Sequence, residues 1–251
     1  MLKYFYLIII FFLFSSSLFA AENTGEKLPK HEWSFEGMTG TFDRSALQRG
    51  FKVYLEACSG CHSINLLYYR DLVDIGFSPE QVKVIASEYT VIDGPNDEGE
   101  MFERQAKPAD KFVGPYRNTN EARYNNNGAY PPDLSVITKS RKGGANYIYN
   151  LLLGYEESTD HEVGEGMYYN KWIPGNQIAM PQVLYDDSVE YDDGTVTTKE
   201  QLAEDLTSFL VWAAEPELEE RKNLGLKVII FFVVMSIMLF LWKTRLWRSV
   251  N

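Results

Sequence analysis

The chain has few of the residues on which small stapled or metal-stabilised domains depend. Its 251 residues include only two cysteines and three histidines. If both cysteines serve one function, none is left for a disulfide framework. Positive charge is also in short supply, because the formal net charge is -11. That balance argues against nucleic acid, and against an anionic membrane surface, as a partner. No internal repeat or low-complexity block is present.

Both cysteines lie in one C-x-x-C-H motif, which runs from Cys58 to His62. Two thiols at this spacing can add to the two vinyl groups of one haem, and the adjacent histidine is then placed to bind the iron. A thioredoxin-like redox pair and half of a zinc site are the alternatives. Zinc would need two further ligands, and no second cysteine cluster supplies them. The motif therefore predicts a c-type cytochrome in which Cys58, Cys61 and His62 hold one covalent haem c.

Residues 1–20 have the order of a secretory signal peptide. Lys3 is followed by an apolar stretch over residues 4–14 and then by small residues up to Ala20 and Ala21. Cleavage is expected after one of these two alanines. An uncleaved N-terminal anchor is the alternative, because a large apolar residue stands two positions before either cut. The stretch lacks the arginines of a mitochondrial transit peptide, so a bacterial exported protein is favoured.

A second apolar segment, residues 224–242, is interrupted only by Lys227. Its length is close to the roughly 20 residues that cross a bilayer core as a helix. A buried helix is the alternative, but the segment has no polar face and ends at the interfacial Trp242. With an exporting N-terminus, one such span leaves residues 21–223 in the periplasm and the basic tail 243–251 in the cytoplasm. This predicts a single-pass protein of the bacterial inner (cell) membrane.

Helical patterns predict a mainly α fold, a c-type cytochrome domain with loop insertions plus one C-terminal transmembrane helix. Ser45 is the expected N-cap of the helix that delivers Cys58, and Thr198 the expected N-cap of the last helix before the span. Asp192-Asp193-Gly194 predicts a turn or hairpin. The expected helices of the head cover residues 45–57, 63–73, 79–88, 147–153 and 198–214.

The second axial ligand decides what kind of haem protein this would be. Met180 stands out among the candidates, because it ends an extended stretch after Pro174-Gly175 that can reach over one face of a haem. The candidates outside the apolar segments and the initiator are Met38, Met101, Met167, Met180, His31 and His161.

Several further stretches give the chain a resemblance to the cytochrome c1 family, the haem subunits of the cytochrome bc1 complex. They cover most of the mature sequence, and the last two are far more specific than the haem motif. Ala179, next to Met180, is glycine in some relatives, which costs backbone freedom only. The stretches are ALQRG at 46–50, YRDL at 69–72, NNGAYPPDLS at 126–135, PGNQIAM at 174–180 and FLVWAAEP at 209–216.

The resemblance implies a role for each site residue. Cys58 and Cys61 would carry the thioether bonds to the haem. His62 would be the proximal iron ligand and Met180 the distal one. Arg141 would pair with a haem propionate.

The resemblance also implies a route for electrons. An iron with ligands on both faces has no vacant position, so the site passes one electron and does little else. Electrons would come from the Rieske iron–sulfur protein, which takes them from quinol at cytochrome b, and would leave to a c-type cytochrome. The chain would be an enzyme only as a subunit of ubiquinol–cytochrome c oxidoreductase. Acidic pairs at 156–157, 186–187 and 192–193 could steer a basic acceptor, although such pairs are more often only solvated.

Two other functions stay open. A haem peroxidase or nitrite reductase would need an open distal site, which would make Met180 incidental. Another membrane-tethered c-type carrier would need a second C-x-x-C-H motif or an N-terminal anchor. The single motif and the C-terminal apolar segment place both below the cytochrome c1 family.

Overall fold

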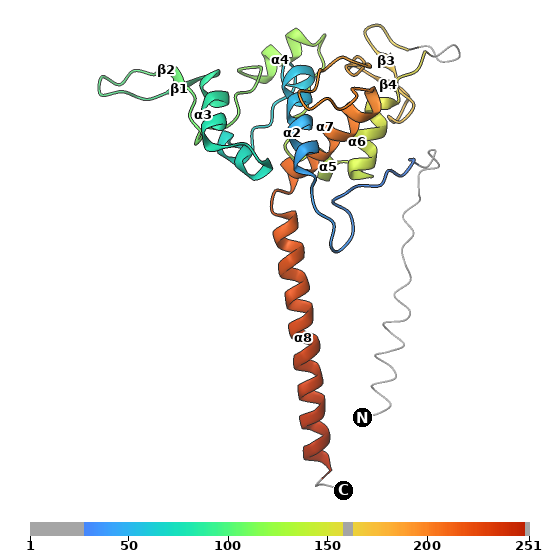
Figure 1. The fold of residues 1–251 in the computed structure, drawn as a ribbon. Coiled ribbons are helices and arrows are strands. Elements are labelled where there is room, and N and C mark those ends of the chain that lie inside the picture. The colour runs from blue at the N-terminus through green and yellow to red at the C-terminus, as the bar shows by residue number, and fades with distance from the viewer. Residues whose placement is uncertain (1–27, 158–162, 249–251) are drawn as a thin grey trace.

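The structure is a computed structural model, and it describes residues 28–157 and 163–248. A helical head stands at one end of a single long helix, α8 (Figure 1). The mainly α fold with one long apolar C-terminal helix is thereby confirmed. The expected signal peptide, His161 and the last three residues of the expected tail lie outside the described residues.

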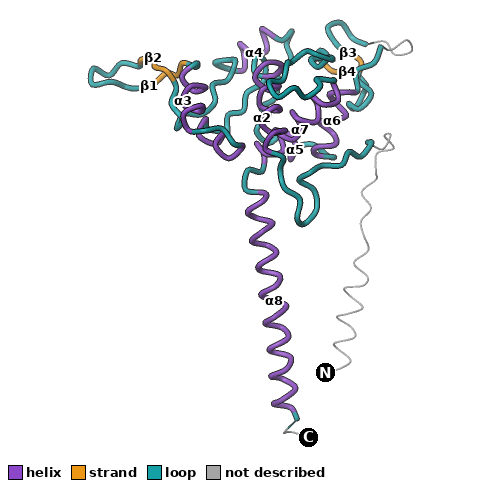
Figure 2. Tube along the Cα trace, viewed as in Figure 1, coloured by secondary structure: helices purple, strands orange, loops and turns teal. Residues whose placement is uncertain are grey.

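Helices dominate the described chain, and its two pairs of strands are short (Figure 2). The strand pairs are antiparallel, with Thr90 opposite Gln105 in the first and Tyr168 opposite Ile178 in the second. In chain order the elements are α2 (Arg44–Val53), the π-helical turn η1 (Tyr54–Cys58), the 3-10 helix η2 (Tyr69–Ile75), α3 (Pro79–Ser87), β1 (Thr90–Asp93), β2 (Phe102–Gln105), α4 (Thr119–Asn125), α5 (Ile137–Ser140), α6 (Gly144–Leu153), β3 (Tyr168–Tyr169), β4 (Gln177–Ile178), α7 (Lys199–Ala214) and α8 (Leu218–Trp247).

The core of the head forms where α2 packs on α7. Leu47 and Phe51 of α2 are buried, and the rings of Phe51 and Phe209 lie 5.6 Å apart between centroids. Burial of one such side chain contributes about 1.5–3 kcal/mol. Gly50 allows the close approach, because a Cβ atom there would lie 2.0 Å from the carbonyl oxygen of Asp205. The helix that delivers the C-x-x-C-H motif is therefore seated on α7 without space for a side chain between the two backbones.

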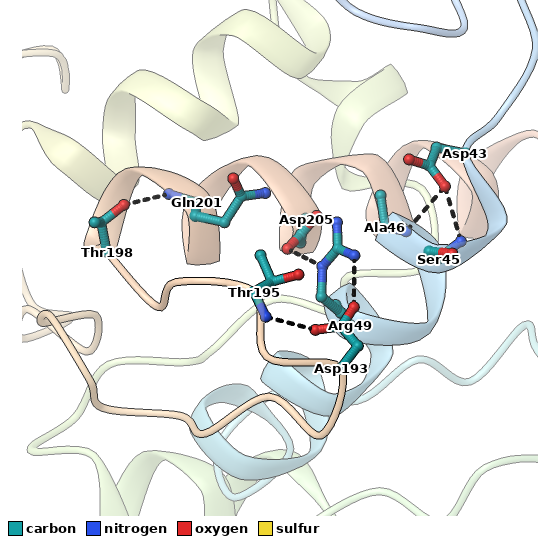
Figure 3. Close-up of polar contacts among 9 residues, drawn as sticks. All are labelled: Asp43, Ser45, Ala46, Arg49, Asp193, Thr195, Thr198, Gln201 and Asp205. Atoms are coloured by element: carbon teal, nitrogen blue, oxygen red, sulfur yellow. Dashed lines mark hydrogen bonds and ion pairs between the residues drawn. The ribbon is translucent and has the colours of Figure 1, made fainter.

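A buried ion pair fixes the same crossing (Figure 3). Arg49 of α2 donates two hydrogen bonds to the carboxylate of Asp205 on α7, at 2.8 and 3.0 Å. It donates a third to Asp193, at 3.0 Å. Asp205 is fully buried, and its hydrogen bond is the main reason that the pKa of Arg49 is raised above its usual value. The predicted turn at 192–194 is confirmed, and it places Asp193 beside α2.

Three of the predicted helices are confirmed as α3, α6 and α7, and Thr198 caps α7 by accepting the Gln201 N–H. The prediction that Ser45 caps the first helix is wrong. Asp43 is the cap, because its carboxylate accepts the N–H groups of Ser45 and Ala46 (Figure 3). An acceptor two residues earlier satisfies the free donors of the first turn, so the helix begins at that point.

The predicted helix over 63–73 is wrong in its first half, since only η2 is helical there. The Ser63 hydroxyl and the Asn65 N–H both donate to Asp133, at 2.8 and 2.9 Å. The Leu66 N–H donates to the Ser135 hydroxyl, at 3.1 Å. The Leu66 N–H would be the first donor to bond within such a helix, but it is bonded to a side chain far along the chain and is not available to the carbonyl four residues earlier.

Helix α8 begins at Leu218, before the predicted span, and runs on to Trp247. It is long and apolar enough to cross a membrane, and the described part of the chain buries none of its most apolar stretch. At about 1.5 Å per residue, this helix is about 45 Å long. It leaves the head as one uninterrupted rod (Figure 1).

Two side chains in the first turns of α8 fasten it to the loop before α2. Glu219 accepts the Phe42 N–H, at 2.6 Å, and a bidentate pair of hydrogen bonds from Arg44. Lys222 donates to the carbonyls of Phe35 and Gly40. The head and the first two turns of α8 are thus joined by hydrogen bonds to one segment of the head.

Removal of residues 226–251 should release a soluble, folded head, because Leu218 is the last buried residue of the described chain. The truncated protein should appear in the soluble fraction and keep the thermal midpoint of the full chain's head, measured by circular dichroism. Truncation from Leu218 is the matched control. It also removes Glu219 and Lys222, so it should lower that midpoint. A head that aggregates after the shorter deletion would contradict the expectation.

Candidate functional site

Helix α2 and the π-helical turn η1 together deliver the C-x-x-C-H motif. Cys58 is buried at the end of η1, and Cys61 is exposed. The N–H groups of Cys61 and His62 both donate to the Cys58 carbonyl, at 3.0 and 2.8 Å. Ser59 secures the preceding turn by donating from its hydroxyl to the Leu55 carbonyl, at 2.6 Å. The two thiols and the imidazole therefore come from a single tight turn.

His62 is held at both its backbone and its ring. The Tyr54 hydroxyl donates to the His62 carbonyl, at 3.0 Å, and Nδ1 of His62 lies 2.7 Å from the Pro132 carbonyl oxygen. A carbonyl oxygen only accepts, so Nδ1 must carry the proton. Burial lowers the pKa of His62, which keeps the ring neutral near pH 7. Nε2 then carries the free lone pair that a metal ligand needs.

Asp133, to which the sequence assigned no role, links the segment after the C-x-x-C-H motif to the segment that carries the Pro132 carbonyl. It accepts hydrogen bonds from Ser63 and Asn65, and also from the Ser135 N–H, at 2.8 Å. Burial opposes the charge of Asp133, yet these hydrogen bonds outweigh it and keep the pKa below its usual value. The orientation of His62 thus depends on the segment around Pro132 as well as on its own turn.

Met180 is half-buried just after β4. Its carbonyl accepts a hydrogen bond from the Tyr155 hydroxyl, at 3.0 Å, and burial raises the pKa of Tyr155, so the phenol stays a donor. Asn170, fully buried, donates to the Leu151 carbonyl of α6, at 2.7 Å, and so packs the β3–β4 pair against that helix. Met180 is therefore held from the C-terminal end of α6.

Arg141 lies exposed directly after α5. Within the described part of the chain it makes no side-chain hydrogen bond or ion pair. Burial raises the pKa of Tyr147 on α6, and the charge of Arg141 partly opposes this, which places the guanidinium near that ring. Arg141 is thus a cation at the junction of α5 and α6 that is available to an anionic group.

Two alternatives for the cysteine motif find no support in the geometry. Burial, helped by the nearby Cys61, raises the pKa of the Cys58 thiol to about 12, whereas a redox-active C-x-x-C pair needs a thiolate near neutral pH. Among residues 28–157 and 163–248, no three His, Cys, Asp or Glu side chains are grouped to hold a metal ion. A structural zinc site at the motif would require such a group.

The acidic pairs differ in what they contact. Asp186 accepts the Lys199 N–H and Asp187 the Thr197 hydroxyl. Asp193 belongs to the Arg49 cluster, and Asp192 pairs with Lys52 while it stays largely exposed. Asp186 and Asp187 thus fix the segment before α7, whereas Asp192 and Asp193 pair with cations of α2.

The comparison with known proteins agrees with these arrangements. A family model described as "Cytochrome C1 family" matches residues 33–250.

The chain belongs to the cytochrome c1 family.

It is 46% identical to "Cytochrome c1 1, heme protein, mitochondrial" of Arabidopsis thaliana over 227 residues. The aligned stretch covers 90% of this chain and 74% of the relative. It is 43% identical over 248 residues to "Cytochrome c1" of Rhodospirillum rubrum, which covers 92% and 91%. "Cytochrome b/c1" of Bradyrhizobium diazoefficiens is 42% identical over 252 residues, which cover 91% of this chain and 37% of that one. The family resemblance that the sequence motifs predicted is confirmed.

The donor set of this family member suits a haem held through two cysteines. Two thiols and the free Nε2 of His62 share one turn, and a thioether is available at Met180. In the described chain, no hydrogen bond links Met180 to His62. Each is held from a different end of the α5–α6 unit, His62 by Pro132 before it and Met180 by Tyr155 after it.

Three of the residues that position this site were missed by sequence reasoning. Pro132 and Asp133 stand in the NNGAYPPDLS stretch, and an aspartate two residues before a serine is a known signal for a local side-chain turn. Tyr155 left no signal, because a single tyrosine after a helix is as often a surface residue.

Proposed function

We propose that the chain is the electron-transfer subunit of a quinol–cytochrome c reductase (bc1) complex and carries one covalently bound haem c. Cys58 and Cys61 are proposed to form the thioether bonds, with His62 as the proximal and Met180 as the distal ligand. Arg141 is proposed to pair with a propionate. The bound haem would supply a one-electron redox centre at the iron.

The single observation that carries the proposal is the hydrogen bond from His62 Nδ1 to the Pro132 carbonyl, 2.7 Å long, within the turn that presents both thiols. It fixes the tautomer and the orientation of the ring before any ligand binds. A carbonyl that accepts a hydrogen bond from the other ring nitrogen usually accompanies a metal-binding histidine. A histidine that was only a core residue would not need a neutral ring, a free Nε2 and two adjacent thiols together.

The other residues of the site are proposed to keep the centre closed. With Met180 as a second ligand, the iron would have no vacant position for oxygen or peroxide, and the Tyr155 hydroxyl donates to the Met180 carbonyl, at 3.0 Å. The chain alone would then pass electrons without transforming a substrate. Its enzymatic role would belong to the whole oxidoreductase complex.

The names of two relatives support the proposed complex with cytochrome b. Relatives include one named "Cytochrome b/c1" and one named "Cytochrome b-c1 complex catalytic subunit, mitochondrial". We infer cytochrome b as a partner in the membrane, a Rieske iron–sulfur protein as the donor and a c-type cytochrome as the acceptor. The head is proposed to lie on the periplasmic side, with residues 224–242 spanning the bacterial inner membrane and the tail 243–251 in the cytoplasm.

Replacement of both Cys58 and Cys61 by serine should abolish haem staining on a denaturing gel, because thioether bonds survive denaturation and iron ligation does not. Each single variant should stain more weakly than the parent. Glu56→Gln, an exposed position in the turn η1, is the matched control and should stain at full strength. Undiminished staining of the double variant would contradict covalent attachment.

A further inference from the structure

A closed loop hangs from the head beside the start of α8. The Thr41 N–H donates to the Ser34 carbonyl, at 3.1 Å, so residues 34–41 form a loop with Gly37 and Met38 at its tip. Gly37 has φ +74, a left-handed conformation that favours glycine. The segment before α2 dips towards the side from which α8 leaves the head (Figure 1). Met38 is 69% exposed, the most exposed apolar side chain of that loop.

The loop is tied to α8 at a definite height. Lys222 donates to the carbonyls of Phe35 and Gly40, one on each arm of the loop. Lys222 lies two residues before the apolar run that begins at residue 224, which is about 3 Å along the helix axis. Leu218 lies six residues before the same point, or about 9 Å. The headgroup layer on one side of a bilayer is about 5–7 Å thick. If residues 224–242 span the membrane, Lys222 lies in that layer, Leu218 lies just outside it, and the loop that Lys222 holds faces the membrane.

A pocket of about 340 Å³ opens at the same place, between the loop, the start of α6 and the first turn of α8. Phe35, Val211 and Leu218 supply apolar walls. Its charged walls carry both signs, with Lys139 and Lys222 opposite in charge to Glu36 and Glu215. A volume of this size is at the low end of ligand pockets, which are about 300–1,000 Å³.

The charged walls of the pocket also keep an unused hydrogen-bond donor and an unused acceptor. Lys222 uses two of its three N–H donors on Phe35 and Gly40, which leaves one. The Glu36 carboxylate is exposed, and no described side chain or N–H pairs with it. Lys139 and Glu215 are paired with each other, at 3.1 Å. The pocket can therefore satisfy one phosphate and one ammonium at the same time.

We propose that this pocket and the tip of the 34–41 loop form a binding site for a zwitterionic phospholipid with a primary ammonium, a phosphatidylethanolamine, of the outer leaflet. The phosphate accepts from Lys222, the ammonium donates to Glu36, and Met38 lies among the upper parts of the acyl chains. A site with charges of both signs suits a zwitterionic headgroup better than a purely anionic headgroup, because Glu36 repels an anion. The proposal goes beyond electron transfer, and it rests on the proposed membrane span of α8 and the proposed periplasmic side of the head.

The position of the loop is tested in the full chain, purified from membranes in the assembly it forms and placed in phosphatidylethanolamine-rich nanodiscs. A nitroxide is attached to Met38→Cys and, as control, to Tyr124→Cys, an 88% exposed position on α4. The parent chain treated in the same way gives the background. The label at 38 should lose its relaxation by a water-soluble nickel chelate and gain relaxation by oxygen relative to 124. Equal access of the chelate at both positions, or exclusion of both agents at 38 by a covering protein, would overturn the proposal.

The choice of lipid is tested by native mass spectrometry of the same purified assembly after exchange into phosphatidylethanolamine, phosphatidylcholine or phosphatidylglycerol. The parent should retain a phosphatidylethanolamine that Glu36→Gln and Lys222→Gln lose, while Lys83→Gln, on the exposed side of α3, retains it. Glu36 is exposed, so its variant cannot act through misfolding. Equal retention of phosphatidylcholine or phosphatidylglycerol, or retention by both pocket variants, would refute the site. Neither result would alter haem staining, so a failure of the lipid site can be distinguished from a failure of the proposed function.

Discussion

Replacement of Met180 by leucine should lower the reduction potential of the haem by on the order of 100 mV or more, since axial-ligand identity spans about 0.8 V in haem proteins. Leucine keeps the volume and removes the sulfur, which favours ferrous over ferric iron. The variant should retain covalent haem and should bind carbon monoxide in the ferrous state, whereas the parent should not. Redox titration and the carbon monoxide difference spectrum measure the two effects.

Met167→Leu is the matched control for this experiment. Met167 is half-buried in the segment just before β3, and it was one of the candidate ligands in the sequence. Its replacement should change neither the potential nor the spectrum. If the parent binds carbon monoxide readily, or if Met180→Leu leaves both observables unchanged, the closed site is disproved and a peroxidase-type site becomes the better hypothesis.

Replacement of Asp205 by alanine should destabilise the head by about 3–5 kcal/mol, the usual cost when one partner of a buried ion pair is removed. Asp205 is 1% exposed at its side chain and Arg49 is 16% exposed, so the guanidinium would remain in the helix crossing without its main partner. Small domains have only about 5–15 kcal/mol of stability, so much of it would be lost. The free energy of unfolding in urea, followed by circular dichroism, measures the effect.

Asp192→Ala, in the loop that precedes α7, provides the contrast. Asp192 pairs with Lys52 at 3.0 Å, but its side chain is 89% exposed. Exposed pairs of this kind contribute less than about 1 kcal/mol, so this variant should unfold close to the parent. Equal losses from the two substitutions would show that burial of the Asp205 pair does not determine its importance.

Much of the fold could be predicted because its helices carry local signals. Thr198 caps α7 and Pro216 follows its end, and both limits were visible in the sequence. The β1–β2 hairpin was not predicted, because the strands pair through backbone groups and their residues, TVID and FERQ, do not alternate between apolar and polar types. The error over 63–73 has a non-local cause, the contact of Asp133 with residues that precede it by about seventy positions.

The site divides in the same way. The C-x-x-C-H spacing encodes the shared turn of Cys58, Cys61 and His62, so local chemistry was enough to find it. The choice of Met180 came from a loop pattern and from the family, because nothing local distinguishes a ligand methionine from any other. The carbonyl of Pro132 could not have been predicted as the partner of His62, since every residue has a carbonyl and only the folded chain selects one.

The continuous α8 also has a mechanical consequence. Only Glu215, Pro216 and Glu217 separate it from α7, and Glu219 and Lys222 hold its first turns against the loop before α2. A head that is joined in this way to a membrane-spanning helix keeps a constant height and orientation above the bilayer. Any change of distance during an electron-transfer cycle would then have to be made by the proteins that visit it. In this assembly the chain would stay in place as the docking site, and its electron donor and electron acceptor would make the movements.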